Sequence, residues 1–255
     1  MILAIDMGNT NIVVGCLKDD TGTLFTERIS TDLGKTELEY AVLLKTILDI
    51  YKISGEDIRG SIISSVVPPL TQILRSALLK LLKKEPLIVG AGLKTGLNIL
   101  LDDPATMGAD LVVDSVATIR HYGVPNIVID MGTATTMAAI DSTGAYLGGI
   151  IFPGVMVSLE SLSAEASLLP RIALDKPKKV IGSNTIDAMK SGILYGEASR
   201  IDGMIDRFEE ELGCKTTVIA TGGLAGTIIP HCRHEISLEP DLMLKGLKII
   251  YDKNA

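Results

Sequence analysis

The sequence predicts an α/β protein built from two similar halves. Residues 5–10, Ile-Asp-Met-Gly-Asn-Thr, return in altered form as residues 129–135, Ile-Asp-Met-Gly-Thr-Ala-Thr. In each copy an aliphatic run leads into a polar tip, and apolar residues then resume, which is the pattern of a β-hairpin. After each hairpin, segments with helical periodicity alternate with short aliphatic runs. We therefore expect mixed sheets flanked by helices in both halves.

Length and composition set the class of protein. The 255 residues suffice for one large domain or two ordinary ones, and 47% hydrophobic against 22% charged residues provides a substantial core. The net charge is −7, and no block of Lys or Arg extends beyond the pairs at 83–84 and 178–179. This charge pattern argues against a nucleic-acid partner, so we expect small molecules or protein as partners.

Three cysteines, Cys16, Cys214 and Cys232, are too few and too scattered for a disulfide framework. The first predicted strand begins at Ile2, which leaves no room for a cleavable signal segment. The longest apolar candidate for a membrane span, residues 147–157, is broken by glycines and a proline and falls short of the roughly 20 residues required. We therefore predict a cytoplasmic protein with no membrane contact.

The first half should continue from its hairpin into alternating strands and helices. Residues 24–30 are a predicted strand, and residues 36–39 have the spacing of a capping box that opens a helix. The apolar face of that helix is predicted to contain Leu38, Ala41, Val42, Ile47 and Leu48. Residues 60–67 and 86–90 are predicted strands on either side of a helix that begins at the proline pair 68–69.

The segment between the halves predicts the domain boundary. Residues 92–104 are rich in Gly and Asp and show little periodicity, whereas residues 111–122 have a helical pattern. We expect this helix to join the halves. The predicted domains are therefore residues 1–122 and residues 123–255.

The second half repeats the plan of the first. Its hairpin covers residues 126–140, and a third strand is predicted over residues 146–152. Two helices follow, of which the longer covers residues 185–212, and a strand over residues 217–220 comes next. A final helix from Pro240 is expected to bury Leu244, Leu247 and Ile250.

The two hairpin tips have the chemistry of a phosphate site. Glycine lets the backbone approach an anion, threonine hydroxyls and turn N–H groups donate hydrogen bonds, and an aspartate such as Asp6 or Asp130 can hold a cation. A single tip of this kind is an ordinary turn, but two related copies favour phosphate binding. The chain contains no phosphate-loop motif, and no Rossmann fingerprint follows the first strand. The hairpins are therefore the candidate nucleotide site.

Three weaker signals remain open at this point. Thr221-Gly222-Gly223 follows a predicted strand and could admit a nucleotide, although a glycine pair there is more often a plain turn. Asp110 stands at a helix start and is either an N-cap, which its residue type favours, or an acid in the cleft. Residues 231–234, His-Cys-Arg-His, have no partner pair for a zinc site and are predicted as an exposed loop.

Six segments stand out in order along the chain: residues 6–11, 92–97, 108–110, 130–136, 148–154 and 181–185. Taken together and in this order, they resemble the motifs of the type III pantothenate kinases, members of the acetate and sugar kinase, actin and heat-shock chaperone superfamily. The resemblance runs almost end to end. It implies two duplicated ribonuclease-H-like (actin-like ATPase) domains with mixed sheets, flanking helices and an interdomain cleft. It also implies ATP-dependent phosphorylation of pantothenate, the first step of coenzyme A synthesis.

The resemblance assigns the nucleotide and metal residues. The first hairpin matches the segment that binds the ATP phosphates and Mg²⁺, here Asp6, Met7, Gly8, Asn9, Thr10, Asn11, Ile12 and Val13. In the second hairpin, Asp130 matches the ligand of a monovalent cation, K⁺ or NH₄⁺, and Thr133 matches an ATP-phosphate contact. Both tips thus acquire a role in holding ATP.

The resemblance also assigns the acceptor residues and a homodimer with the acceptor site near the subunit interface. Asp110, within the motif Gly108-Ala109-Asp110, matches the catalytic base that takes the proton of the acceptor's primary hydroxyl. Thr185 matches a pantothenate contact. Two positions depart from the family: Leu101 replaces a usual tyrosine, and Leu111 replaces a usual arginine. Because both lost side chains help to hold pantothenate in relatives, we predict weak pantothenate binding.

Three hypotheses follow from the sequence. The leading one is a type III pantothenate kinase. The second keeps the nucleotide hairpins but assigns a different hydroxyl acceptor, and the third is a non-enzymatic nucleotide-binding regulator. The retained Asp6, Asp110, Asp130 and Thr133 favour an enzyme, since a binding module needs no base.

Overall fold

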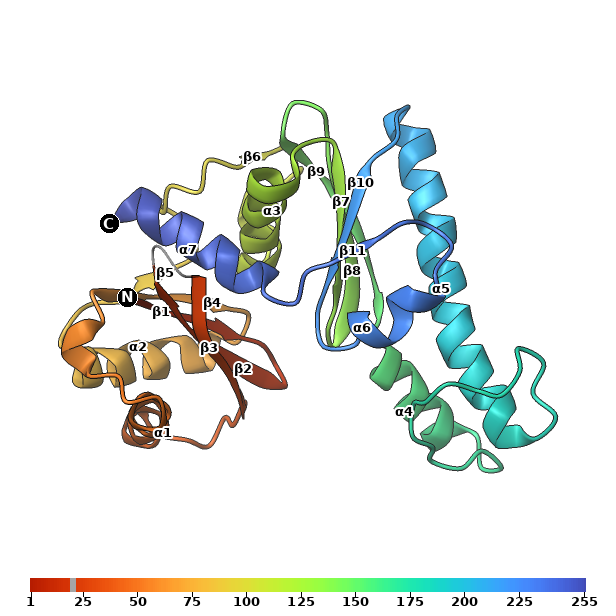
Figure 1. Cartoon of the computed structure of the whole chain (residues 1–255), viewed down its shortest axis with the longest axis horizontal. Coiled ribbons are helices and arrows are strands. Elements are labelled where there is room, and N and C mark those ends of the chain that lie inside the picture. Colours follow the sequence, from red (N-terminus) through yellow and green to blue (C-terminus); the bar gives the residue numbers. More distant parts are fainter. Residues whose placement is uncertain (19–21) are drawn as a thin grey trace. The chain divides into compact units, whose positions relative to one another are not determined.

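A computed structural model describes residues 1–18 and 22–255. The chain forms two compact units (Figure 1). The first contains Met1–Leu97, Asp103–Ala117 and Asp241–Ala255, and the second contains Asn98–Asp102 and Thr118–Pro240. This division differs from the predicted halves, because the chain returns at its end to pack the final helix on the first sheet.

The strands and helices of the first unit follow the predicted order. Its sheet contains β1 (Ile2–Met7), β2 (Asn11–Lys18), β3 (Gly22–Ser30), β4 (Gly60–Ser65) and β5 (Leu87–Ile88). Its helices are α1 (Glu37–Ile50), α2 (Pro68–Leu82), α7 (Leu242–Asn254), the first part of α3 (Ala109–Tyr122), and the short 3₁₀ turns Gly55–Asp57 and Pro104–Thr106.

The second unit contains the remaining elements. Its strands are β6 (Asn98–Ile99), β7 (Asn126–Met131), β8 (Ala134–Ile140), β9 (Ala145–Pro153), β10 (Thr217–Thr221) and β11 (Ser237–Leu238). Its helices are the end of α3, α4 (Val155–Glu165), α5 (Thr185–Leu212), α6 (Ala225–Ile228) and a 3₁₀ turn, Ile229–His231. Strands β6 and β11 and helix α6 were not predicted, since each has only two to four residues and lies in a segment without a clear strand or helix pattern.

The two sheets share one topology, which confirms the predicted duplication. The first has the strand order β3-β2-β1-β4-β5, and the second has β9-β8-β7-β10-β11 with β6 added beside β9. In both, a hairpin pairs with a third antiparallel strand on one side and with parallel strands on the other. Asp6 opposite Val13 in the first hairpin corresponds to Asp130 opposite Thr136 in the second. The two aspartates therefore occupy equivalent places in the two sheets.

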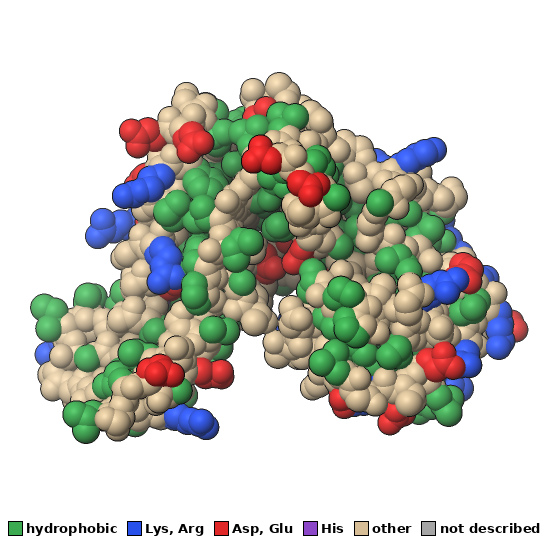
Figure 2. Space-filling view, turned by 180° about the vertical axis from the view of Figure 1, so that it is seen from behind, with side chains coloured by type: hydrophobic (Ala, Val, Ile, Leu, Met, Phe, Trp, Pro, Cys, Tyr) green, Lys and Arg blue, Asp and Glu red, His purple; other side chains and the backbone are tan. Residues whose placement is uncertain are grey.

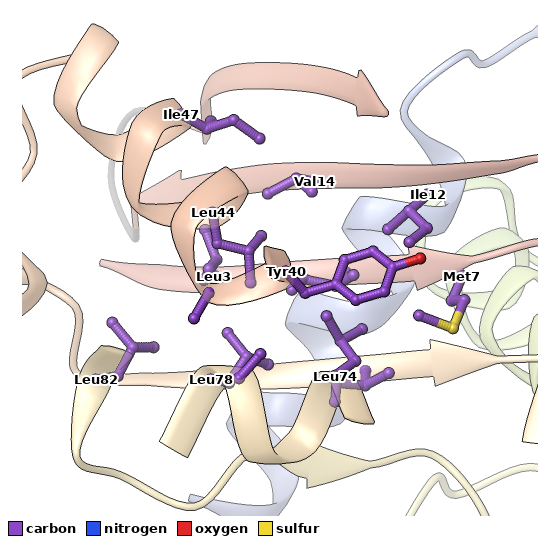
Figure 3. Packing of buried hydrophobic residues seen from close by; sticks show 14 of the residues in the cluster. Leu3, Met7, Ile12, Val14, Tyr40, Leu44, Ile47, Leu74, Leu78 and Leu82 are labelled. Atoms are coloured by element: carbon purple, nitrogen blue, oxygen red, sulfur yellow. The ribbon is translucent and has the colours of Figure 1, made fainter. Parts of the chain in front are cut away.

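Helices α1 and α2 cover one face of the first sheet (Figure 3). The predicted capping box is confirmed, because Thr36 and Glu39 bond to each other's backbone N–H at the start of α1. The predicted apolar face of α1 is partly wrong: Leu38 and Val42 are 63% and 54% exposed, respectively. Its buried stripe contains Tyr40, Ala41, Leu44, Ile47 and Leu48. Packing against the sheet thus decides which apolar residues of α1 are buried, and hydrophobicity alone did not identify them.

Tyr40 connects this core to the segment after β3. Its ring is fully buried among Met7, Ile12 and Leu74 (Figure 3). Its hydroxyl donates to the carbonyl of Asp32 at 2.9 Å and accepts from the N–H of Asp32 at 3.1 Å. A buried tyrosine needs such a partner for its hydroxyl. The bond holds residues 31–34 beside the first hairpin tip.

Helix α7 covers the other face of the first sheet, where it packs with α3 on Ile2, Ala4 and Ile62. Leu244, Leu247 and Ile250 are buried as predicted. The second sheet is covered on one face by α4, α5 and α6. Helix α5 begins and ends at the predicted residues.

Two surface properties bear on partners. No helix in the described parts of the chain is both long and apolar enough to cross a bilayer. On the face shown in Figure 2, Lys and Arg side chains are interspersed with Asp and Glu rather than gathered into one basic stripe.

Candidate active site

The first hairpin tip is a closed turn. The Gly8 N–H donates to the carbonyl of Asn11 at 3.0 Å. Thr31, just after β3, donates its N–H to the carbonyl of Thr10 at 3.0 Å and its hydroxyl to the carbonyl of Gly8 at 2.6 Å. These bonds fix the backbone of the tip and leave the side chains of Asn9 and Thr10 at the surface. A rigid, polar and exposed tip suits an anionic ligand.

A hollow of about 500 Å³ adjoins this tip. It is lined by Asn9, by residues 31–34, and by Val66, Val67 and the proline pair 68–69. Tyr40 stabilises residues 31–34 through its two bonds to Asp32. The first unit thus offers a concave surface directly beside the candidate phosphate turn.

Asp6 is the last polar residue of β1 before the tip. It is half-buried, and its neighbour across the parallel pair β1–β4 is Ser64. The described residues contain no cluster of three or more His, Cys, Asp or Glu side chains suited to a metal ion. Mg²⁺ bound with nucleotide phosphates commonly uses only one or two carboxylates and keeps several waters. A single half-buried aspartate beside a phosphate turn therefore fits Mg²⁺.

The second hairpin tip is held by a glycine of another segment. The Gly132 N–H donates to the carbonyl of Ala134 at 3.0 Å, and the Gly154 N–H donates to the carbonyl of Thr133 at 3.1 Å. A methyl group added to Gly154 would lie 2.5 Å from the carbonyl oxygen of Gly132. Only glycine permits this approach, so Gly154 packs directly against the backbone of the tip. Thr133 at the tip is exposed.

Asp130 lies beside the glycine pair that the sequence left as a weak motif. Asp130 is the last polar residue of β7, and Thr221 is its register partner on the parallel strand β10. Gly222 follows with φ +94°, and a methyl group on it would lie 2.5 Å from the Asp130 Oδ1. The motif therefore packs against the candidate cation ligand. The parallel pairing of β7 with β10, which periodicity cannot show, was the missing signal.

Asp110 lies in the first turn of α3, not at its N-cap. The carbonyl of Gly108 accepts the N–H of Val112 at 3.2 Å, which places the cap at Gly108. The Asp110 Oδ1 accepts the Leu111 N–H at 2.8 Å. A methyl group on Gly108 would collide with this oxygen, so the glycine leaves room for the carboxylate. The N-cap interpretation is therefore wrong, although the carboxylate does satisfy one helix N–H.

The surroundings of Asp110 favour its protonated form more than water does. Burial raises the pKa of the Asp110 carboxyl, and the hydrogen bond from the Leu111 N–H offsets part of that rise. A carboxylate with a raised pKa is a stronger base than an ordinary surface aspartate. A raised pKa is one property of a general base, so this environment agrees with the role that the resemblance predicts for Asp110, which stays a prediction.

The residues assigned to the acceptor are distributed over both units. Ala109 and Leu111 are half-buried beside Asp110 in the first unit. In the second unit, Leu101 is half-buried and its Cδ2 lies 3.6 Å from the position of a methyl group on Gly148. Thr185 is the exposed first residue of α5, whose cap Asn184 accepts the N–H of Asp187 at 2.9 Å. Their roles toward an acceptor stay predictions.

Residues 231–234 pack against α5. Asp202 accepts the N–H groups of Arg233 and His234, and the His234 Nε2 lies 2.9 Å from the Asp206 Oδ1. Residues 232–234 form a loop and Arg233 is exposed, as predicted, but Cys232 and His234 lie partly buried against α5, so the predicted exposure is only partly confirmed. Contacts with a distant helix, which the local sequence does not record, cover these side chains.

Comparison with known proteins gives the family. The family model described as type III pantothenate kinase matches residues 2–207. A type III pantothenate kinase from Halalkalibacterium halodurans is 46% identical over 255 residues, which is 100% of both chains. The chain belongs to the type III pantothenate kinase family. It carries two equivalent hairpins and Asp110 in the geometry given above.

Solved structures show the same fold at low identity. A Sinorhizobium meliloti protein described as a putative 2-dehydro-3-deoxygalactonokinase has a TM-score of 0.61 and 12% identity, with 98% of this chain and 96% of that chain covered. A Campylobacter jejuni protein described as a Baf family transcriptional activator has a TM-score of 0.60 and 18% identity, with 99% and 98% covered. These likenesses confirm the predicted actin-like ATPase and sugar kinase fold.

Proposed function

We propose that this member of the type III pantothenate kinase family transfers the γ-phosphoryl group of ATP to the primary hydroxyl of pantothenate, giving 4′-phosphopantothenate. The observation that carries the proposal is Asp110, on a chain with full-length similarity to a type III pantothenate kinase. Burial raises the pKa of this carboxyl. Asp110 accepts the proton of the attacking hydroxyl as the O–P bond forms and the bond to ADP breaks.

The two tips divide the binding of ATP. Residues 6–13, with the exposed Asn9 and Thr10 on a fixed turn, bind the phosphates, and Thr133 of the second tip adds a contact. Asp6 holds Mg²⁺, which supplies positive charge to the phosphate oxygens when bound. Asp130, with Gly222 packed against its Oδ1, holds a monovalent cation, K⁺ or NH₄⁺.

The acceptor is assigned to Gly108, Ala109, Leu101, Leu111 and Thr185 in addition to Asp110. Leu101 and Leu111 provide no charge for the carboxylate of pantothenate, so we assign a high Michaelis constant for this substrate.

We further propose a cytoplasmic homodimer. The exposed apolar side chains of the second unit support dimer formation, since Ile151, Leu168, Val180 and Ile181 are 64–90% exposed. Cys16, Cys214 and Cys232 are free thiols, which fits a reducing compartment. Light scattering of the purified protein tests the dimer.

The test of function is phosphoryl transfer from γ-labelled radioactive ATP to a panel of primary alcohols with and without a carboxylate. Radiolabelled 4′-phosphopantothenate as the main product confirms the proposal. Preference for an uncharged alcohol would instead favour the second hypothesis, a related kinase with another acceptor. ATP binding without transfer to any alcohol would favour a nucleotide-binding regulator.

A further inference from the structure

Helix α7 lies against the two elements that carry Asp6 and Asp110 in the first unit. It packs on β1, which contains Asp6, and on the first part of α3, which begins one residue before Asp110. No residue of α7 belongs to a motif that carries the family resemblance. Its packing against α3 nevertheless includes a glycine in direct contact with backbone of the candidate catalytic helix.

Gly246 makes this contact. It is buried, and a methyl group on it would lie 2.7 Å from the Val113 Cγ1, 3.0 Å from the Val113 carbonyl carbon, and closer still to the Val113 carbonyl oxygen. Ordinary carbon–carbon contacts lie at about 3.5–4.0 Å, so the helices would have to separate by about 0.5–1 Å to admit a side chain. A carbonyl group cannot rotate away as a flexible side chain can.

Helix α7 is held against the sheet on both sides of this contact. If α7 and α3 separate, it is therefore α3 that moves. Leu244 lies over Gly15 of β2, where a methyl group would be 2.6 Å from the Leu244 Cδ1. The Tyr251 ring fills the space beside Gly60 of β4. The guanidinium of Arg59 lies 5.4 Å from the centre of that ring. Displacing α7 would break these contacts with the sheet.

The end of α7 adds a further anchor. The Asn254 side chain donates to the carbonyl of Lys94 at 2.9 Å and accepts the N–H of Lys94 at 2.9 Å. The Lys253 Nζ donates to the carbonyl of Thr95 at 2.6 Å. The helix is thus fixed at its start, middle and end. Val113 is one turn after Asp110 on α3, so a displacement at Val113 moves the carboxylate directly.

We infer that Gly246 is a positioning residue of this kinase. Because it has no side chain, α3 packs closely on α7, and this packing fixes the position of the Asp110 carboxylate. The inference rests on the proposed role of Asp110 as the base. Catalytic groups must be placed closely, and a displacement of about 1 Å can cost roughly 10²-fold in rate.

The test is Gly246→Ala with Gly196→Ala as the matched control. Gly196 is an exposed helical glycine of α5 with nothing within 4 Å of an added methyl group, so its substitution has the same helix propensity effect without the collision. We expect Gly246→Ala to lower kcat by about 10- to 100-fold with the KM for ATP changed less than about twofold. Gly196→Ala should match wild type.

A second pair of variants covers the case in which Gly246→Ala does not fold. Val113 and Val116 are both buried in the same cluster on α3, and the close contact of Gly246 is with Val113. We expect Val113→Ala to lower kcat several-fold more than Val116→Ala at similar loss of melting temperature. Equal losses of kcat in this pair, or wild-type kcat in Gly246→Ala, would overturn the inference.

Hydrogen exchange separates this inference from the proposed function. In Gly246→Ala, amides of residues 109–117 should exchange faster than in wild type and in Gly196→Ala, whatever the acceptor is. Faster exchange with no pantothenate phosphorylation by wild type would support the packing role and refute the proposed function. Unchanged exchange would overturn the positioning role even in an active kinase.

Discussion

Replacing Asp110 by asparagine separates the chemistry of this residue from its structural contribution. Asparagine keeps the shape and retains an oxygen that can accept the Leu111 N–H, which wild-type Asp110 accepts at 2.8 Å. It cannot accept the proton of a hydroxyl. Loss of a general base typically costs about 10²–10⁴ in rate, so we expect kcat to fall by that factor.

Whereas kcat should fall in Asp110→Asn, the stability of the fold should not. Burial raises the pKa of Asp110 in the folded protein above its unfolded value, so the ionised form destabilises the fold at neutral pH. The uncharged amide of Asp110→Asn removes this penalty, and the melting temperature at pH 7 should therefore stay equal or rise. The difference between variant and wild type should shrink as the pH falls through the raised pKa, because wild-type Asp110 then becomes neutral as well.

Asp141→Asn is the matched control. The Asp141 carboxylate also accepts backbone N–H groups, from Thr143 and Ala145, and hydrogen bonds led by the Thr143 hydroxyl lower its pKa. Its ionised form therefore stabilises the fold above the unfolded pKa, and this stabilisation is lost as the pH falls through the lowered pKa. We expect Asp141→Asn to lower the melting temperature at pH 7 and to leave kcat unchanged, the reverse of Asp110→Asn.

The assay is ADP release coupled to NADH oxidation, with melting curves by calorimetry and ATP affinity by isothermal titration. The acid limb of the wild-type kcat profile should lie above the ordinary aspartate range of about 4, because the base must be ionised. A kcat of Asp110→Asn within about tenfold of wild type, or an acid limb in the ordinary range, would refute the role of Asp110 as the base.

Three further predictions concern the cation and the acceptor. Turnover should rise when K⁺ or NH₄⁺ replaces Na⁺ at fixed ionic strength, and equal rates would remove Asp130 as a cation ligand. Gly222→Ala should abolish this response, because its φ of +94° disfavours alanine and the methyl group would lie 2.5 Å from the Asp130 Oδ1; a retained response measured in the same assay would contradict this. The double variant Leu101→Tyr with Leu111→Arg should lower the KM for pantothenate about tenfold or more, since a charge-assisted contact contributes roughly 1.5–3 kcal/mol. The KM for ATP should stay unchanged. Steady-state kinetics that show no gain for pantothenate would reject the assignment of both leucines to the acceptor pocket.

The sequence by itself determined the elements that depend on local patterns. Capping residues placed the start of α1 at Glu37, and the length and period of α5 gave both its ends at Thr185 and Leu212. The repeated Asp-Met-Gly segment predicted two equivalent hairpins, and the strand orders of the two sheets confirm the duplication. These features were predictable because caps, turns and period are properties of neighbouring residues.

Tertiary structure alone decided the features that depend on distant residues. Sheet packing selected Tyr40 and Leu44 on α1 and left Leu38 exposed, because an apolar residue becomes buried only where a partner surface meets it. The return of α7 to the first sheet changed the division of the chain into units. Parallel pairing brought Gly222 to Asp130, and helix packing brought Gly246 to Val113. Such contacts join segments far apart in sequence, and no local pattern records them.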